Sequence, residues 1–206
     1  MPNANPQDMA TATAPAIRQL PLYTADQVFW SCRRAVVVAP HPDDETLGCG
    51  GAIALLRQRS IPVQILVISD GTGSHPNSQC YPSERLQNLR EQETRLAARR
   101  LGVAPQAITF WRWPDTAVPQ PGEKNFQIAV DCGRRYFRRH NPTLVFVPWQ
   151  GDGHRDHRAT WEIVQQALPA WPIPRQLAYS IWGSPAAGLS ALPLGGNGLA
   201  AGYSFR

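Results

Sequence analysis

The sequence predicts an α/β fold, with a mostly parallel sheet and helices on both of its faces. Three short stretches are continuously apolar and rich in β-branched residues: AVVVAP at 35–40, VQILVIS at 63–69 and TLVFVP at 143–148. Such runs are typical of strands that are buried on both sides of a parallel sheet. Segments with helical periodicity separate them. This alternation predicts crossover helices that cover the two faces of the sheet.

The remaining elements follow the same alternation along the chain. Two shorter strand candidates are AITFWRW at 107–113 and QLAYSIW at 176–182. The patterns predict helices at 47–59, 83–101, 123–139 and 157–168. In the second of these, Ser83 is the expected N-cap, and Leu101-Gly102 is a C-terminal stop signal.

The two ends of the chain differ in composition from its middle. Residues 1–20 are rich in Pro, Ala, Asn and Thr and predict a mobile N-terminal tail. The length then suits one domain over residues 21–206. Beyond residue 183 the Gly-, Pro- and Ala-rich stretch predicts loop.

The composition excludes several classes of protein. Hydrophobic residues make up 43% of the 206 residues and charged residues 17%, as in a globular chain. No window approaches eighteen apolar residues, and the N-terminus lacks a basic and apolar leader. We therefore expect no membrane span, no secretory signal and a cytoplasmic location. The four cysteines stand singly, which favours reduced thiols: Cys32, Cys49, Cys80 and Cys132.

A net charge of +5 and a pI near 9.4 are compatible with a nucleic-acid or anionic partner. However, the arginines lie mostly in two helical segments, RLQNLREQETRLAARR and GRRYFRRH. Glu91 and Arg95 also have the favourable i,i+4 spacing of a solvated helix face. We therefore expect ordinary charged helix surfaces and no nucleic-acid partner.

Polar clusters follow the first and third of the apolar strands. HPDDE comes directly after the first strand, and GDGHRDH follows TLVFVP. Ligands of open α/β sheets bind at the carboxyl ends of the strands. Three adjacent carboxylates repel one another, so a bound divalent cation would explain the crowding at 43–45.

His41, Asp44 and His157 form a candidate metal-ligand set of two histidines and one carboxylate. Three protein ligands and one open position are typical of a catalytic zinc site. The same set suits iron(II), so both metals remain open. The alternative for a His-Asp pair in a loop is a turn held by local hydrogen bonds.

The residues beside this set suit the hydrolysis of an acyl bond. Asp43 is placed to take a proton from a water whose pKa the metal lowers towards ~7. His154 could stabilise the developing oxyanion as an imidazolium. Asp156 is close enough in sequence to orient a histidine through a hydrogen bond.

The sequence resembles the LmbE-like or PIG-L family of zinc-dependent N-acetyl-sugar deacetylases. The resemblance rests on AVVVAPHPDDETLGCGGAIALL and the later GDGHRDHRAT. It continues between them through VISDGTGSH, RLQNLREQETRLAARRLGV and FWRWPD, and it covers roughly positions 33–183. It implies a Rossmann-like fold with one zinc ion and a hydrolase that removes the acetyl group from an N-acetylglucosamine-type sugar or glycoconjugate.

The resemblance also implies a role for individual residues. His41, Asp44 and His157 would be the zinc ligands and Asp43 the general base. His154, held by Asp156, would stabilise the oxyanion or act as general acid, and two positions would contact sugar hydroxyls: Arg90 and Asp115. The partner would be a small N-acetylated sugar, and a homo-oligomer is left open.

The sequence departs from the family pattern at two places. Arg155 stands where a proline or small residue is common, and members usually continue with a further helix beyond the segment resembling GYSFR. We therefore expect a domain that is short at its C-terminus relative to the family.

Two other classes of function compete with this interpretation. Gly48, Gly50 and Asp70 could belong to a dinucleotide-binding domain, but Ile53 replaces the third glycine. The acids at 43–45 would also repel a pyrophosphate at the helix N-terminus. The second alternative is a non-catalytic protein, either a metal-binding relative or a basic nucleic-acid binder.

Overall fold

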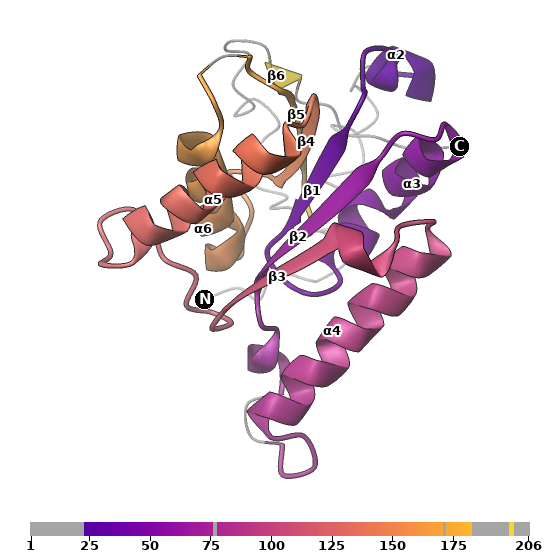
Figure 1. The fold of residues 1–206 in the computed structure, drawn as a ribbon. Coiled ribbons are helices and arrows are strands. Elements are labelled where there is room, and N and C mark those ends of the chain that lie inside the picture. The colour runs from indigo at the N-terminus through magenta and orange to yellow at the C-terminus, as the bar shows by residue number, and fades with distance from the viewer. Residues whose placement is uncertain (1–22, 76–77, 171, 183–197, 200–206) are drawn as a thin grey trace, which may run out of the picture.

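The computed structural model describes residues 23–75, 78–170, 172–182 and 198–199 of the chain. Within them, six strands form one sheet in the order β3-β2-β1-β4-β5-β6, and every neighbouring pair is parallel (Figure 1). This is the strand order of Rossmann-type domains. The strands are β1 (Ala35–Ala39), β2 (Val63–Ser69), β3 (Ile108–Trp113), β4 (Leu144–Pro148), β5 (Arg175–Tyr179) and β6 (Gly198–Leu199).

Helices connect the strands and confirm the predicted α/β class. A short helix, α2 (Ala25–Phe29), precedes β1, and its capping box joins Thr24 to Gln27. The other helices are α3 (Asp44–Gln58), α4 (Ser83–Arg100), α5 (Phe126–His140) and α6 (Arg155–Ala167). Two single 3-10 turns complete the set: η1 (Thr72–Ser74) and η2 (Pro105–Ala107).

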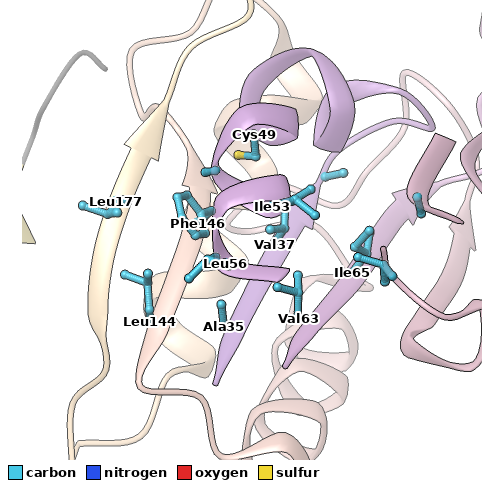
Figure 2. Packing of buried hydrophobic residues seen from close by; sticks show 14 of the residues in the cluster. Ala35, Val37, Cys49, Ile53, Leu56, Val63, Ile65, Leu144, Phe146 and Leu177 are labelled. Atoms are coloured by element: carbon cyan, nitrogen blue, oxygen red, sulfur yellow. The ribbon is translucent and has the colours of Figure 1, made fainter. Parts of the chain in front are cut away.

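The sheet has a hydrophobic core on each face because successive strand residues point to opposite sides. On one face, Val37 and its same-face neighbours pack against α3 (Figure 2). Two residues of α2 and Ala98 of α4 belong to the same core. On the other face, Val36 and Val38 pack against α5 and α6. All five residues of β1 are buried. The prediction of helices on both faces is therefore confirmed.

The strand order reverses at β1, which pairs with β2 on one side and β4 on the other. The chain leaves β1 and β4 at the same edge of the sheet, and α3 and α6 begin there. Ligands of such sheets bind in the crevice at this switch point. Both histidine-bearing loops lie at this position.

Several predicted boundaries differ from the structure. Helix α3 begins three residues before the predicted start at 47, α6 two residues before 157, and α5 three residues after 123. The prediction of Ser83 as an N-cap is wrong, since Ser83 is the first residue of α4 and Pro82 precedes it.

Some expectations fall wholly or partly outside the described residues. The predicted mobile tail at 1–20 lies outside them, as do 183–197 and 200–206 of the predicted C-terminal loop. Residues 198–199 of that stretch pair with β5 as a short strand instead. In the part of the chain that the structure describes, no helix has the length and apolarity of a membrane span.

Candidate metal centre

The loop after β1 and the loop after β4 bring the predicted ligands together. Asp43 is the N-cap of α3 and Asp44 its first residue, so both face the end of β1. His154 is the N-cap of α6, and His157 lies in the first turn of that helix. Residues more than a hundred positions apart thus meet at the switch point of the sheet.

Three ligand atoms form a nearly equilateral triangle. His41 Nδ1 lies 3.1 Å from Asp44 Oδ2, His157 Nε2 lies 3.2 Å from the same oxygen, and the two ring nitrogens are 3.3 Å apart. A tetrahedral zinc ion with bonds of about 2.0–2.2 Å separates its ligand atoms by about 3.3 Å. The triangle therefore fits such an ion, and Asp44 and His157 are both buried.

Two other groupings of side chains at this place could also hold a cation. One combines His41 with His154 and His157, and the other combines His41 with Asp115 and Asp156. In each group the ligand atoms lie within 4.8 Å of one another. All the groupings include His41, but its Nδ1 faces Asp44 and His157, whereas its Nε2 faces Asp115 and Asp156.

The charges of the centre favour a cation. Burial alone would lower the pKa of His41, but hydrogen bonds to Asp115, Asp156 and Asp44 outweigh it and raise this pKa to about 11. Burial would raise the pKa of Asp44, yet His157 and His41 hold it well below its usual range. The carboxylates thus keep positive charge on the neighbouring imidazoles. A divalent cation would satisfy the same carboxylates.

Asp43 occupies a strained turn beside the triangle. Its φ of 121° is a backbone conformation that side-chain-bearing residues rarely adopt. Its carboxylate accepts a hydrogen bond of 2.7 Å from Arg90 Nη2, and its backbone N–H donates to Glu45 Oε2 at 3.0 Å. Burial raises the pKa of Asp43, and the Arg90 guanidinium opposes that rise. A half-exposed carboxylate is therefore fixed next to the candidate ligands.

The structure also brings the two predicted sugar contacts into the centre. Arg90 binds Pro42 O and Glu93 as well as Asp43. Asp115 Oδ1 lies 3.2 Å from His41 Nε2, and its Oδ2 accepts a hydrogen bond from Gly73 N. Both side chains thus support residues of the centre, and contact with a sugar remains a prediction.

The prediction that Asp156 holds His154 needs correction. The Asp156 carboxylate accepts hydrogen bonds from the backbone N–H groups of Thr116 and Val118, and its Oδ2 lies 3.3 Å from His41 Nε2. Its contact with His154 is through its own backbone N–H, which donates to His154 Nδ1 at 3.2 Å. The loop after β3 thus holds the Asp156 carboxylate next to His41. Asp156 therefore orients His41.

His154 packs edge-on against His41, with the ring centroids 4.6 Å apart. Burial and the charge of His41 lower the pKa of His154. This favours a neutral imidazole in the metal-free centre, and the imidazolium expected at this position stays a prediction. A neutral ring can still donate one hydrogen bond to an oxyanion.

Asp152 belongs to the centre as well, although the residue pattern did not predict it. Its carboxylate is buried and lies 3.3 Å from His157 Nδ1, on the side of the ring opposite the triangle. Its place two residues before His154 in GDGHRDH is the signal that was available, since acids beside metal-ligating histidines commonly orient them. Only the fold shows that the Asp152 carboxylate lies next to the ring of His157.

Hydrogen bonds join the loop after β2 to the loop after β3, next to the centre. Asp70 Oδ1 accepts hydrogen bonds from Thr72 N, Thr72 Oγ1 and Asp115 N. Gly73 approaches Asp115 so closely that an added Cβ would lie 2.9 Å from its Cγ. These bonds fix the backbone that carries Asp115.

The sequence matches the family described as PIG-L, GlcNAc-PI de-N-acetylase, over residues 36–168, a stretch that includes both histidine-bearing loops. The chain belongs to the PIG-L family. Deacetylases of the PIG-L family depend on a metal, and the described residues contain the histidine and aspartate groups that could bind one.

Curated PIG-L relatives are deacetylases of N-acetylated sugars. The chain is 30% identical over 143 residues to a probable N-acetyl-alpha-D-glucosaminyl L-malate deacetylase 2 of Bacillus anthracis, covering 68% of this chain and 61% of the relative. It is 29% identical over 139 residues to a diacetylchitobiose deacetylase of Thermococcus kodakarensis, covering 66% and 49%. The chain therefore spans about half to three fifths of the length of these relatives.

Solved structures share the fold. An N,N'-diacetylchitobiose deacetylase from Pyrococcus horikoshii superposes with a TM-score of 0.61 at 22% identity, covering 81% of this chain and 59% of that one. A conserved protein from Thermus thermophilus superposes with a TM-score of 0.57 at 27% identity, covering 73% and 67%. The PIG-L assignment thus agrees with the Rossmann-like fold.

Proposed function

We propose that this chain is a zinc-dependent hydrolase that removes the acetyl group from an N-acetylglucosamine-type sugar or glycoconjugate. The observation that carries the proposal is the triangle of His41 Nδ1, Asp44 Oδ2 and His157 Nε2, with the Asp43 carboxylate held beside it. The PIG-L match and the deacetylase relatives support the same chemistry.

The three triangle residues would hold the metal. When bound, zinc would polarise the amide carbonyl and lower the pKa of a water towards ~7. Two histidines and one carboxylate also suit iron(II), so zinc is the narrower part of the proposal. The triangle edges support a tetrahedral ion, which is the geometry that zinc prefers.

The chain's own residues would then move the protons. Asp43 would take a proton from the attacking water and deliver it to the departing amine, as a general base and then acid. Arg90 would keep the Asp43 carboxylate in place through the 2.7 Å hydrogen bond. His154 would donate a hydrogen bond to the oxyanion.

Asp115 and Asp156 would set the tautomer of His41. Both carboxylates lie within 3.3 Å of His41 Nε2, so the proton belongs on that nitrogen and Nδ1 is left to face the triangle. This assignment accounts for the Asp156 carboxylate, since Asp156 contacts the His154 imidazole through its backbone N–H instead. Arg90 and Asp115 remain the proposed sugar contacts, and the partner is a small N-acetylated sugar.

The dinucleotide-binding alternative shares the strand order but not the site. The first turn after β1 carries Asp44 and Glu45, whose side chains are both buried, at the place where a pyrophosphate would bind. Negative charge at this helix N-terminus opposes a second anion. The acidic turn therefore favours a metal.

The test is acetate release from a panel of N-acetylglucosamine conjugates by zinc-loaded protein, with and without a chelator. We expect chelator-sensitive release that falls at least about 100-fold in Asp43→Asn, since general base catalysis contributes about that much. Asp131→Asn, on the surface of α5, is the matched control and should behave as wild type. Zinc-loaded protein that releases no acetate from any conjugate would contradict the proposal in favour of a non-catalytic relative.

A further inference from the structure

Asp152 is a buried carboxylate that the proposed mechanism does not use. It lies in the loop between β4 and α6 and is 1% exposed. Its Oδ1 accepts a hydrogen bond of 3.0 Å from the backbone N–H of His154. Its Oδ2 accepts hydrogen bonds from the backbone N–H groups of Ile181 and Trp182, at 3.2 and 3.1 Å. The same oxygen lies 3.3 Å from His157 Nδ1.

We propose that Asp152 is a positioning residue that couples metal binding at His157 to the order of the segment after β5. The inference rests on the proposed metal centre, because it takes His157 Nε2 as a ligand atom. Through one oxygen, Asp152 connects the ligand ring to the chain at Ile181 and Trp182.

The first half of the coupling lies at the His157 ring. The Nε2 atom of His157 belongs to the ligand triangle. The proton of the neutral ring therefore belongs on Nδ1, which faces Asp152. This Nδ1 is buried, and its approach to Asp152 falls short of hydrogen-bond geometry. A cation at Nε2 withdraws electron density from the ring and makes Nδ1–H a stronger donor. The bond to Asp152 should therefore tighten when metal binds.

The second half lies at the segment beyond β5. In addition to the two amides on Asp152, Gly153 N donates a hydrogen bond of 3.2 Å to Trp182 O. The backbone of Trp182 is thus held at both its N–H and its carbonyl by the loop that carries the histidines. Trp182 as a whole is 62% exposed, so backbone bonds rather than burial of the side chain fix this residue.

Coupling of this kind is reciprocal. If metal binding fixes Asp152 and Asp152 fixes the two amides, then metal should slow local opening at 181–182. Equally, weakening Asp152 should weaken metal binding. Both effects are measurable without a substrate.

The first measurement is zinc affinity, by competition with a chromophoric chelator. Asp152→Asn keeps the size of the side chain but removes the charge that strengthens the His157 donor. We expect affinity to fall about 10- to 100-fold, the usual effect of losing such a partner. Asp131→Asn is the matched control, an exposed carboxylate paired with Arg134. Affinity within about threefold of wild type in Asp152→Asn would overturn the proposal.

The second measurement is amide hydrogen exchange at Ile181 and Trp182, with and without zinc. In the wild type we expect zinc to slow exchange at both amides, and in Asp152→Asn we expect exchange to be the same in both conditions. The wild-type experiment stands alone if the variant folds poorly. Exchange that does not respond to zinc in the wild type would overturn the coupling.

The absorption spectrum of the cobalt(II)-substituted protein separates positioning of the ligand from general destabilisation. A changed orientation of His157 should shift the d–d bands of Asp152→Asn, while Asp131→Asn should match wild type. Active enzyme without the coupling would overturn this inference alone. A coupled metal centre without acetate release would overturn the proposed function alone.

Discussion

At the scale of residues, the amino-acid pattern predicted the members of the centre better than their contacts. His41, Asp44 and His157 were predicted from residue type and loop position, and their candidate ligand atoms lie within 3.3 Å of one another. The partner of Asp156 was predicted wrongly, because it depends on the loop after β3, forty residues away in sequence. Asp152 was missed because its role depends on a segment near residue 181.

The adjacent acids Asp43 and Asp44 should differ in what their substitution removes. Asp44 Oδ2 contacts both histidines of the triangle, so Asp44→Asn should weaken zinc affinity at least about 100-fold. Asp43 faces Arg90 instead, so Asp43→Asn should bind zinc within about threefold of wild type. Equilibrium dialysis with metal analysis measures both. Equal losses in the two variants would mean that the ligand assignment is wrong.

At the scale of elements, the strands were predicted to within one or two residues at most ends, and α4 begins at residue 83 as predicted. The starts of α3, α5 and α6 differ from their predictions by two or three residues. The predicted start of α3 at residue 47 followed apolar periodicity, whereas the first turn carries the buried acids Asp44 and Glu45. The same applies to α6, whose first turn buries Asp156 and His157. Polar side chains of the candidate centre break the apolar pattern at these helix starts, and tertiary contacts bury them.

Close packing of α5 on α6 provides a test that is independent of the metal. A Cβ added at Gly133 would lie 2.6 Å from Ala167 Cβ, so the two helices must shift apart. We expect Gly133→Ala to lower the free energy of unfolding by about 1–3 kcal/mol through overpacking, despite the better helix propensity of alanine. Urea denaturation measures the change. Ile128→Ala, at a half-exposed position of α5, should cost less, and the reverse ranking would contradict this packing.

At the scale of the whole molecule, hydrophobicity separated the central strands from their neighbours. The three continuously apolar runs became β2, β1 and β4, which are adjacent in the sheet and almost wholly buried. The two less uniform candidates became β3 and β5, which flank them and are only partly buried. Strand burial on both faces explains this difference. The strand order itself is not encoded in local pattern, because it depends on crossovers between distant segments.

The same order places the centre at the edge where β1 and β4 end side by side. Two polar loops could be assigned to one site from the sequence only because parallel strands share a carboxyl edge. The hydrogen bonds that join Asp70 to Asp115 and Asp152 to Ile181 could not be predicted from the sequence, because they connect loops that meet only in the folded chain. The centre is therefore built from loops that follow several strands of the sheet.

The most direct test of the central claim is a zinc titration of metal-stripped protein, followed by acetate release from an N-acetylglucosamine conjugate. The three atoms of the triangle surround a single position, so the centre should hold one catalytic ion. We therefore expect activity to be absent without metal, to rise linearly with zinc and to reach its plateau at one zinc ion per chain. Full activity in the metal-stripped protein, or no activity once zinc is bound at that ratio, would contradict the account.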